Sequence, residues 1–276
     1  MLGGIVSVQF GAAIAVTLIP SVGVGGSVLM RLAFATAILL VAARPRLRGH
    51  SRAAWLRVVA FGVVLGLMNA SFYGALSHLP IGVAVTVEFL GPLVLAAVLS
   101  RRFRDLAAIL AAGVGVVLIS EAFSVPLASL SWLGLALAMS AGAFWAAYIV
   151  LSGKVGESFP RLDGLALAMS VATLVVLPLG VSSVPTWSTI DLGKGLGIAL
   201  LSSVVPYSLE LMALRRLSAQ VFGILLSLEP AVAALAGMLV LGQFLHPLQL
   251  AGMALVVTAS VIVLGLGATT KPPPEV

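Results

Sequence analysis

Three carboxylates and one arginine lie within long apolar stretches of this 276-residue chain: Glu88, Glu210, Glu229 and Arg31. In a membrane, an ionised side chain near the centre of a helix costs about 2.5–3.5 kcal/mol even on lenient insertion scales. Each of the four therefore needs a partner or a water-filled cavity. One interpretation is that they pair as clamps between helices. For Glu88 and Glu210 we favour the other interpretation, which is contact with a substrate or transfer of a proton.

Neutral polar and aromatic residues recur near these carboxylates at helical spacing. Ser203, Tyr207 and Glu210 stand at positions i, i+4 and i+7, so they share one face of a helix. Such stripes are often helix packing, but their recurrence in several stretches favours a lined cavity. The predicted lining comprises Gln9, Phe10, Asn69, Phe72, Tyr73, Glu88, Trp145, Tyr148, Ser203, Tyr207 and Glu210. The predicted proton carriers are Glu88, Glu210 and Glu229.

Composition indicates which elements must position these residues. Hydrophobic residues make up 61% of the chain, charged residues 9%, and the mean hydropathy is +1.21. Because so little polar surface cannot cover a soluble globule, we predict an all-α integral membrane protein with ten transmembrane helices. The predicted spans are 3–19, 23–43, 57–77, 82–99, 105–122, 131–151, 163–180, 195–214, 220–241 and 247–267.

The basic residues gather in alternate connections between these spans. One set of connections and the C-terminal tail hold every Lys and Arg except Arg31 and Lys194. This imbalance predicts that the set lies in the cytoplasm together with both termini. The basic residues are spread over short connections and form no continuous basic surface or basic tail. The net charge of +6 therefore does not indicate nucleic-acid binding. The chain has no cysteine, and we predict no metal site and no cofactor.

A sequence pattern occurs once in each half of the chain. The segment LPIGVAVTVEFLGP, from Leu79 to Pro92, is answered 138 residues later by LSAQVFGILLSLEP, from Leu217 to Pro230. The pattern predicts two repeats of five helices, 1–123 and 131–267, followed by a tail at 268–276. Because five is odd, the second repeat enters the membrane in the inverted sense. Pro92 and Pro230 each interrupt a span, either as a hinge or as a fixed kink.

Longer segments resemble a known family. They are SSVVPYSLELMALRRLSAQVFGILLSLEPAVAALAGMLVLGQ from Ser202 to Gln243, MRLAFATAILLVAARP in the second span and NASFYGALSHLPIGVAVTVEFLGPL in the third and fourth. Over essentially its whole length the chain is similar to the EamA-type branch of the drug/metabolite transporter superfamily, and most similar to its threonine/homoserine exporter group. The resemblance implies a ten-helix inverted-repeat fold in the bacterial inner membrane. It also implies a central cavity lined by spans 1, 3, 4, 6, 8 and 9.

These observations together predict a proton-coupled exporter of small neutral amino acids that works by alternating access. Glu210 or Glu88 would accept the ammonium group, and Asn69, Tyr207, Tyr148 or Gln9 would bind the carboxylate. Arg31 lies on the second span, outside the set that the resemblance implies, so we predict a structural role for it. The expected partners are a small-molecule substrate, protons and membrane lipid.

Other functions fit the same residues. The aromatic lining also permits aromatic amino acids, nucleobase-like metabolites, or lipophilic cations and drugs as substrates. An intramembrane enzyme is disfavoured because His50, His78 and His246 all lie in predicted loops, without Ser-His, paired-Asp or metal-ligand spacing in the spans. A channel is also conceivable, although no ring-forming selectivity motif is visible.

Overall fold

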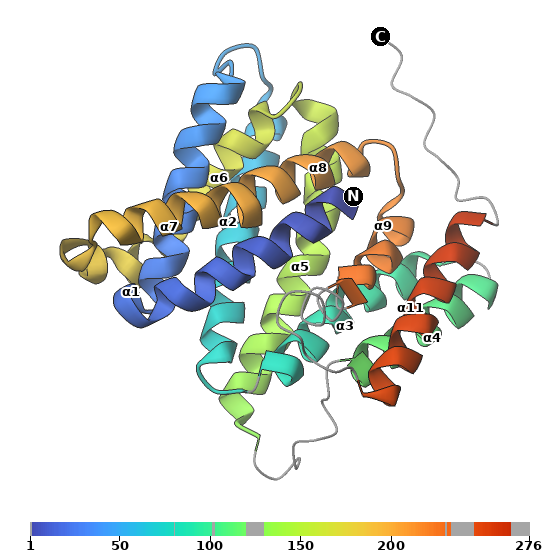
Figure 1. Cartoon of the computed structure of the whole chain (residues 1–276). Helices are drawn as coiled ribbons and strands as arrows, with labels where there is room; N and C mark the ends of the chain where they lie inside the picture. Colours follow the sequence, from blue (N-terminus) through green and yellow to red (C-terminus); the bar gives the residue numbers. More distant parts are fainter. Residues whose placement is uncertain are drawn as a thin grey trace. The chain divides into compact units, whose positions relative to one another are not determined.

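The computed structural model describes residues 2–79, 81–100, 103–119, 130–229, 231–232 and 246–265, and these contain helices and no strand (Figure 1). The helices are α1 (Leu2–Ala43), α2 (Arg52–Leu76), α3 (Ile81–Leu99), α4 (Phe103–Ile119), α5 (Trp132–Ser158), α6 (Asp163–Gly180), η3 (Val181–Thr186), α7 (Thr189–Ala199), η4 (Leu200–Val204), α8 (Val205–Leu214), α9 (Ala219–Leu226) and α11 (Pro247–Gly265).

Helix α1 contains the first two predicted spans and bends sharply between them. The bend lies at Gly23, which has φ 71° and ψ 172°, a conformation that is essentially restricted to glycine. Pro20 precedes it and supplies no N–H to the helix. Figure 1 shows the blue chain turning back at this point. The predicted break between residues 19 and 23 is therefore confirmed, although no loop separates the two spans.

The other predicted spans coincide with helix in the described residues, with some corrections to their ends and one interruption: α9 ends at Leu226, inside the predicted span 220–241, and Ser227 forms a turn. Helix α5 continues to Ser158 beyond the predicted end at 151, and α7 begins at Thr189 before the predicted start at 195. The early start has a local cause, because Ser188 and Asp191 form a reciprocal capping box. Of the predicted span 220–241, residues 230 and 233–241 lie outside the described part.

Among the described residues, five helices are long and apolar enough to cross a membrane. They are Thr17–Ala43, Arg52–Leu76, Trp132–Ser158, Asp163–Thr186 and Thr189–Leu214. The described residues also contain shorter apolar helices, which are Val83–Leu99, Asp105–Ile119 and Pro247–Ala259. These segments make the chain a multi-pass membrane protein by length and composition.

The chain forms two compact units. The first unit contains Met1–Tyr73 and Val150–Arg215, and the second contains Gly74–Ile149 and Arg216–Val276. Each unit draws on both halves of the sequence, so the units do not coincide with the predicted repeats. The repeat boundaries at 123 and 131 stay a prediction.

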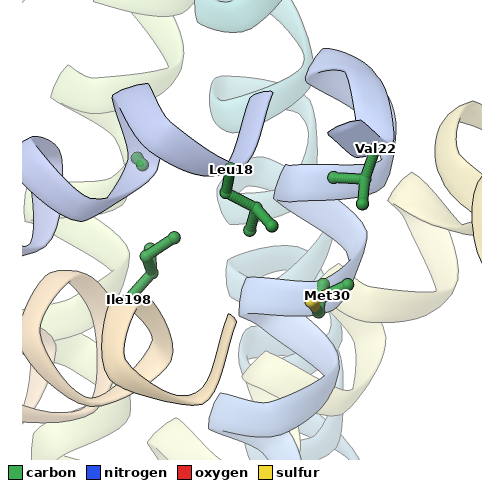
Figure 2. Close-up of a cluster of buried hydrophobic side chains, with 5 residues drawn as sticks. Leu18, Val22, Met30 and Ile198 are labelled. Carbon is green, nitrogen blue, oxygen red and sulfur yellow. The ribbon is translucent and has the colours of Figure 1, made fainter. Parts of the chain in front are cut away.

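In the first unit, glycines allow helices to pack with their backbones close together. A Cβ on Gly62 would lie 2.5 Å from the Val171 Cβ, and one on Gly66 would lie 2.7 Å from the Val175 Cβ. The Gly62-x3-Gly66 motif is therefore a contact surface of α2 against α6, as small residues in membrane helices commonly are. Beside the bend of α1, an apolar cluster of Ala15, Leu18, Val22, Met30 and Ile198 packs α7 against both arms of α1 (Figure 2).

The second unit is built from α3, α4, α9, α11 and the first part of α5. Helices α4 and α11 meet at a glycine pair, where a Cβ on Gly115 would lie 2.7 Å from the Gly252 carbonyl oxygen. Helix α9 approaches α3 at its proline, with a Gly223 Cβ position 2.9 Å from the Pro92 oxygen. Helix α3 runs through Pro92 without interruption.

Candidate functional site

A buried arginine in the first unit binds two side chains of α2. Arg31, on the second arm of α1, is 8% exposed. Its Nη1 donates to the Tyr73 hydroxyl at 3.3 Å, and its Nη2 donates to Asn69 Oδ1. The guanidinium carbon also lies 5.3 Å from the centroid of the Tyr73 ring, within the range of a cation–π contact. The Nε atom has no hydrogen-bond partner among the described residues.

Asn69 is held so that its amide oxygen faces the arginine. Its Nδ2 donates to the Leu65 carbonyl oxygen one helical turn earlier at 2.8 Å. The Asn69 side chain is also hydrogen-bonded to Tyr207 of α8. Asn69 therefore links α1, α2 and α8 at one point inside the first unit.

Helix α8 contributes a tyrosine and a carboxylate to the same place. Tyr207 interacts electrostatically with Arg31, Glu210 and Tyr73. Glu210, 8% exposed, lies one turn further along α8. We call Arg31, Asn69, Tyr73, Tyr207 and Glu210 the polar cluster. It gathers a guanidinium, a carboxyl group and three neutral hydrogen-bonding groups within one unit of a membrane protein.

A widened helical turn precedes this part of α8. Residues Leu200–Val204 form a π-helical turn, closed by a hydrogen bond from the Val205 N–H to the Leu200 carbonyl. Pro206 explains the distortion, because proline supplies no N–H to the carbonyl four residues earlier and its ring crowds that carbonyl. Ser203 lies in this turn, is fully buried, and its hydroxyl has no partner among the described residues. Such π turns occur frequently at functional sites.

The first arm of α1 supports the π turn from the other side. The Ser7 hydroxyl donates to the Leu201 carbonyl at 2.7 Å, and Gly11 leaves room for the Ser202 side chain. Phe72 packs edge to face on Tyr73, with ring centroids 5.9 Å apart. Phe10, also predicted to line the cavity, is 57% exposed, so the structure does not bring it into the buried part of the cluster. The Gln9 side chain lies outside what the structure describes.

The remaining predicted residues belong to the second unit. Glu88 is 9% exposed and interacts electrostatically with Glu229 of the segment after α9. The backbone carbonyl of Glu88 lacks its usual helical N–H partner, because residue 92 is a proline. A Cβ on Gly142 of α5 would lie 2.6 Å from this carbonyl oxygen, so the two helices are in close contact here. Next to it, Phe89 and Trp145 pack edge to face at 4.9 Å. Tyr148 is fully buried, and Pro230 lies outside the described residues.

The contacts of Arg31 were not anticipated from the sequence. The second span was expected to lie outside the lining set, yet Arg31 contacts Asn69 and Tyr73, two residues predicted to line the cavity. One signal was available. Arg31 is the one cation in the interior of a predicted span, since Arg57 stands at the first position of the span 57–77, and a buried carboxylate such as Glu210 requires a positive or neutral donor nearby.

Comparisons with known proteins identify relatives along nearly the whole chain. The threonine/homoserine exporter RhtA of Escherichia coli (strain K12) is 38% identical over 268 residues, which cover 94% of this chain and 88% of the relative. The protein of the same name from Salmonella typhimurium (strain LT2) is 36% identical over 92% of this chain and 86% of the relative.

A family pattern and a solved structure agree with these relatives. The pattern of the EamA-like transporter family matches residues 132–265. A crystal structure of a protein that is 17% identical superposes with a TM-score of 0.76 over 96% of this chain and 97% of the other, a likeness of fold. From its sequence identity to these exporters and the matched family pattern, the chain belongs to the EamA-like transporter family, among the relatives of RhtA.

Proposed function

We propose that this protein exports small neutral amino acids of the threonine/homoserine kind, coupled to protons, by alternating access. The polar cluster is the observation that carries the proposal. An amino acid at neutral pH bears one carboxylate and one ammonium group, and the cluster offers one guanidinium and one carboxyl group, both of which interact with Tyr207, together with neutral donors. The names of the relatives support the substrate class.

In this proposal the substrate carboxylate binds Arg31. A guanidinium presents paired N–H donors that match a carboxylate, and the Arg31 Nε has no partner among the described residues. The ammonium group binds Glu210, while Tyr207 and Asn69 orient the substrate between them. Each charged contact replaces hydration that the substrate loses on leaving water, which is the main cost of moving a zwitterion into a membrane protein.

Proton coupling is assigned to the carboxylates Glu88, Glu229 and Glu210. Glu88 and Glu229 are neighbours in the second unit, and a change in the charge of one alters the energy of the other. Pro92, which supplies no N–H to α3, is proposed as a hinge, with Pro230 as its counterpart in the repeat. The two repeats, 1–123 and 131–267, would then be inverted in the membrane with both termini in the cytoplasm.

Counterflow in proteoliposomes tests the substrate class. Vesicles loaded with unlabelled threonine should accumulate radiolabelled threonine, with homoserine competing, and an imposed pH gradient should change the rate. Tryptophan, uracil and tetraphenylphosphonium should not compete. Competition by one of these three, together with no threonine counterflow, would contradict the amino-acid assignment.

Glu210→Gln tests the ammonium contact in the same assay. The substitution keeps volume and hydrogen bonding but removes a charge-assisted contact, so the apparent affinity for threonine should fall about 10-fold to 100-fold. Glu157→Gln, at the exposed end of α5, is the matched control and should leave affinity unchanged. Wild-type affinity in Glu210→Gln would remove this residue from the site.

A further inference from the structure

A pocket separate from the polar cluster lies in the first unit, at the end of one membrane helix and the start of another. It has a volume of about 600 Å³ and lies between the end of α1 and the start of α6. Its charged lining consists of Arg44, Arg46, Arg161 and Asp163, and Val41 lines its apolar side. None of these residues belongs to the polar cluster or was predicted to bind a substrate.

The pocket has an excess of positive charge. Asp163 is its one carboxylate and is already engaged: its Oδ2 accepts from the Arg46 backbone N–H at 3.3 Å, and it attracts the Arg215 guanidinium. Arg215 in turn donates to the carbonyl oxygens of Phe159, at 3.1 Å, and of Arg161. In the described part of the chain, no ion pair or hydrogen bond is found for the guanidinium groups of the three lining arginines.

The backbone at two of these arginines is held in a conformation that side chains disfavour. Arg44 has φ 48° and Arg161 has φ 45°, and they are the only residues other than glycine with positive φ in the described ranges. Such conformations are strained and gather at ligand sites, where the surrounding structure enforces them. The hydrogen bond from Arg215 to the Arg161 carbonyl is one such constraint.

The position of the pocket fits a ligand at the membrane surface. Arg44 directly follows the apolar span Thr17–Ala43, and Asp163 is the first residue of the span Asp163–Thr186. The two helices run side by side, linked by a hydrogen bond between the Thr36 and Thr173 hydroxyls at 2.8 Å. Val41 is 71% exposed and belongs to the last turn of the apolar span Thr17–Ala43. The arginines therefore lie at headgroup depth, with an apolar surface immediately beyond them.

We propose that this pocket binds a phosphate group, presented by the headgroup of an anionic phospholipid or by a soluble phosphate ester. Arginine side chains pair with phosphate oxygens through two parallel N–H donors, and basic pockets between membrane helices bind anionic headgroups. A lipid places its glycerol and acyl chains along Val41. A soluble ester occupies the arginines alone.

Native mass spectrometry of the full chain in nonionic detergent tests this site. Wild type should retain phosphatidylglycerol in preference to phosphatidylcholine, or bind glycerol 3-phosphate. Arg44→Gln/Arg161→Gln should weaken that binding by at least about tenfold, because each arginine supplies a charge-assisted contact. Arg48→Gln/Arg52→Gln removes the same charge outside the pocket and should bind like wild type.

A phospholipid and a soluble phosphate ester give different results in this experiment, and either result supports a phosphate-binding site. Retention of phosphatidylglycerol that glycerol 3-phosphate does not displace identifies a lipid, and displacement identifies a soluble ester. A second variant, Arg161→Gly, removes the guanidinium while relieving the backbone strain, so a folded protein is obtained even if the double variant fails. Equal binding in Arg161→Gly and wild type, or no anion preference in wild type, would overturn the proposal.

Discussion

At the scale of single residues, Arg31 is the position where charge, burial and hydrogen bonding meet. It is a cation inside the membrane-spanning part of the chain, fixed by Asn69 and Tyr73 rather than by lipid headgroups. A guanidinium held in this way has a defined direction, and direction is what distinguishes a carboxylate-binding fork from a diffuse positive charge.

Arg31→Lys and Arg31→Gln separate these two contributions. Lysine keeps the charge but cannot bind a carboxylate with two parallel donors, and glutamine loses both. We expect threonine affinity to fall in both variants, by about 10-fold to 100-fold in Arg31→Gln. Binding is measured on purified protein beside Arg57→Gln, which alters an exposed arginine at the start of α2. Reduced folded yield with unchanged affinity in the surviving protein would restore the structural role.

Ser203 offers a test of substrate selectivity. A buried hydroxyl without a partner can bind a hydroxyl-bearing ligand, and a ligand lacking that group leaves it unsatisfied. Ser203→Ala should reduce the preference for homoserine over 2-aminobutyrate by about threefold to tenfold. Ser170→Ala is the control, because the Ser170 hydroxyl already donates to the Ala166 carbonyl at 2.9 Å. The competition constants of the two ligands in counterflow decide the matter, and an unchanged ratio would exclude Ser203.

The sequence could indicate most members of the polar cluster but not its cation. Ser203, Tyr207 and Glu210 are close in the chain, so helical periodicity relates them directly. Arg31 and Asn69 come together only because α1 and α2 pack in one unit, and spacing along the chain carries no information on that contact. The π turn could not be predicted from the sequence either, although Pro206 follows it closely in the chain.

At the scale of elements, the bend of α1 depends on one glycine. Gly23→Ala should lower stability by about 1–3 kcal/mol, because alanine does not tolerate this backbone conformation. None of the described neighbouring atoms lies within 4 Å of the added Cβ, so the cost is conformational rather than steric. Thermal unfolding midpoints in detergent measure the effect.

Gly153→Ala is the matched comparison. Gly153 is also in open space but within the regular helix α5, where alanine should stabilise by about 0.5–1 kcal/mol. The two substitutions should therefore shift the midpoint in opposite directions. Shifts of the same sign and size would show that the bend is not held by the glycine conformation.

Element ends were the least predictable feature. Hydropathy locates the apolar centre of a helix, but its ends depend on capping and on polar turns that continue beyond the apolar run. The Ser188–Asp191 box sets the start of α7, and a further hydrogen bond from the Ser21 hydroxyl to Asp191 at 2.7 Å ties that start to the bend of α1. The hydrogen bond between Ser21 and Asp191 joins residues that are far apart in the sequence.

At the scale of the whole molecule, the repeat and the contact units describe different properties. The 138-residue offset records similarity between halves, whereas the units record which helices pack together, and each unit uses both halves. Similar sequences therefore need not pack with each other. The all-helical membrane fold followed from composition, since lipid requires backbone groups to be satisfied within each segment.

The proposed topology is tested by reporter fusions at Gly49 and Thr270. Both should report the cytoplasm, because the connection around Gly49 carries Arg44, Arg46 and Arg48, and the tail carries Lys271. An alkaline phosphatase signal from either fusion would contradict the inverted arrangement. A fusion of the same reporter to a known periplasmic protein serves as the positive control.

The bend at Gly23 also bears on how the protein is made. Because no loop separates its two arms, nothing polar needs to be carried across the bilayer between them. The arms can leave the translocon together as a helical hairpin, and the proposed topology places the arginines after Ala43 on the side of synthesis. Insertion of α1 would then be a single paired event, and a few hydrophilic residues added at the bend would impede it.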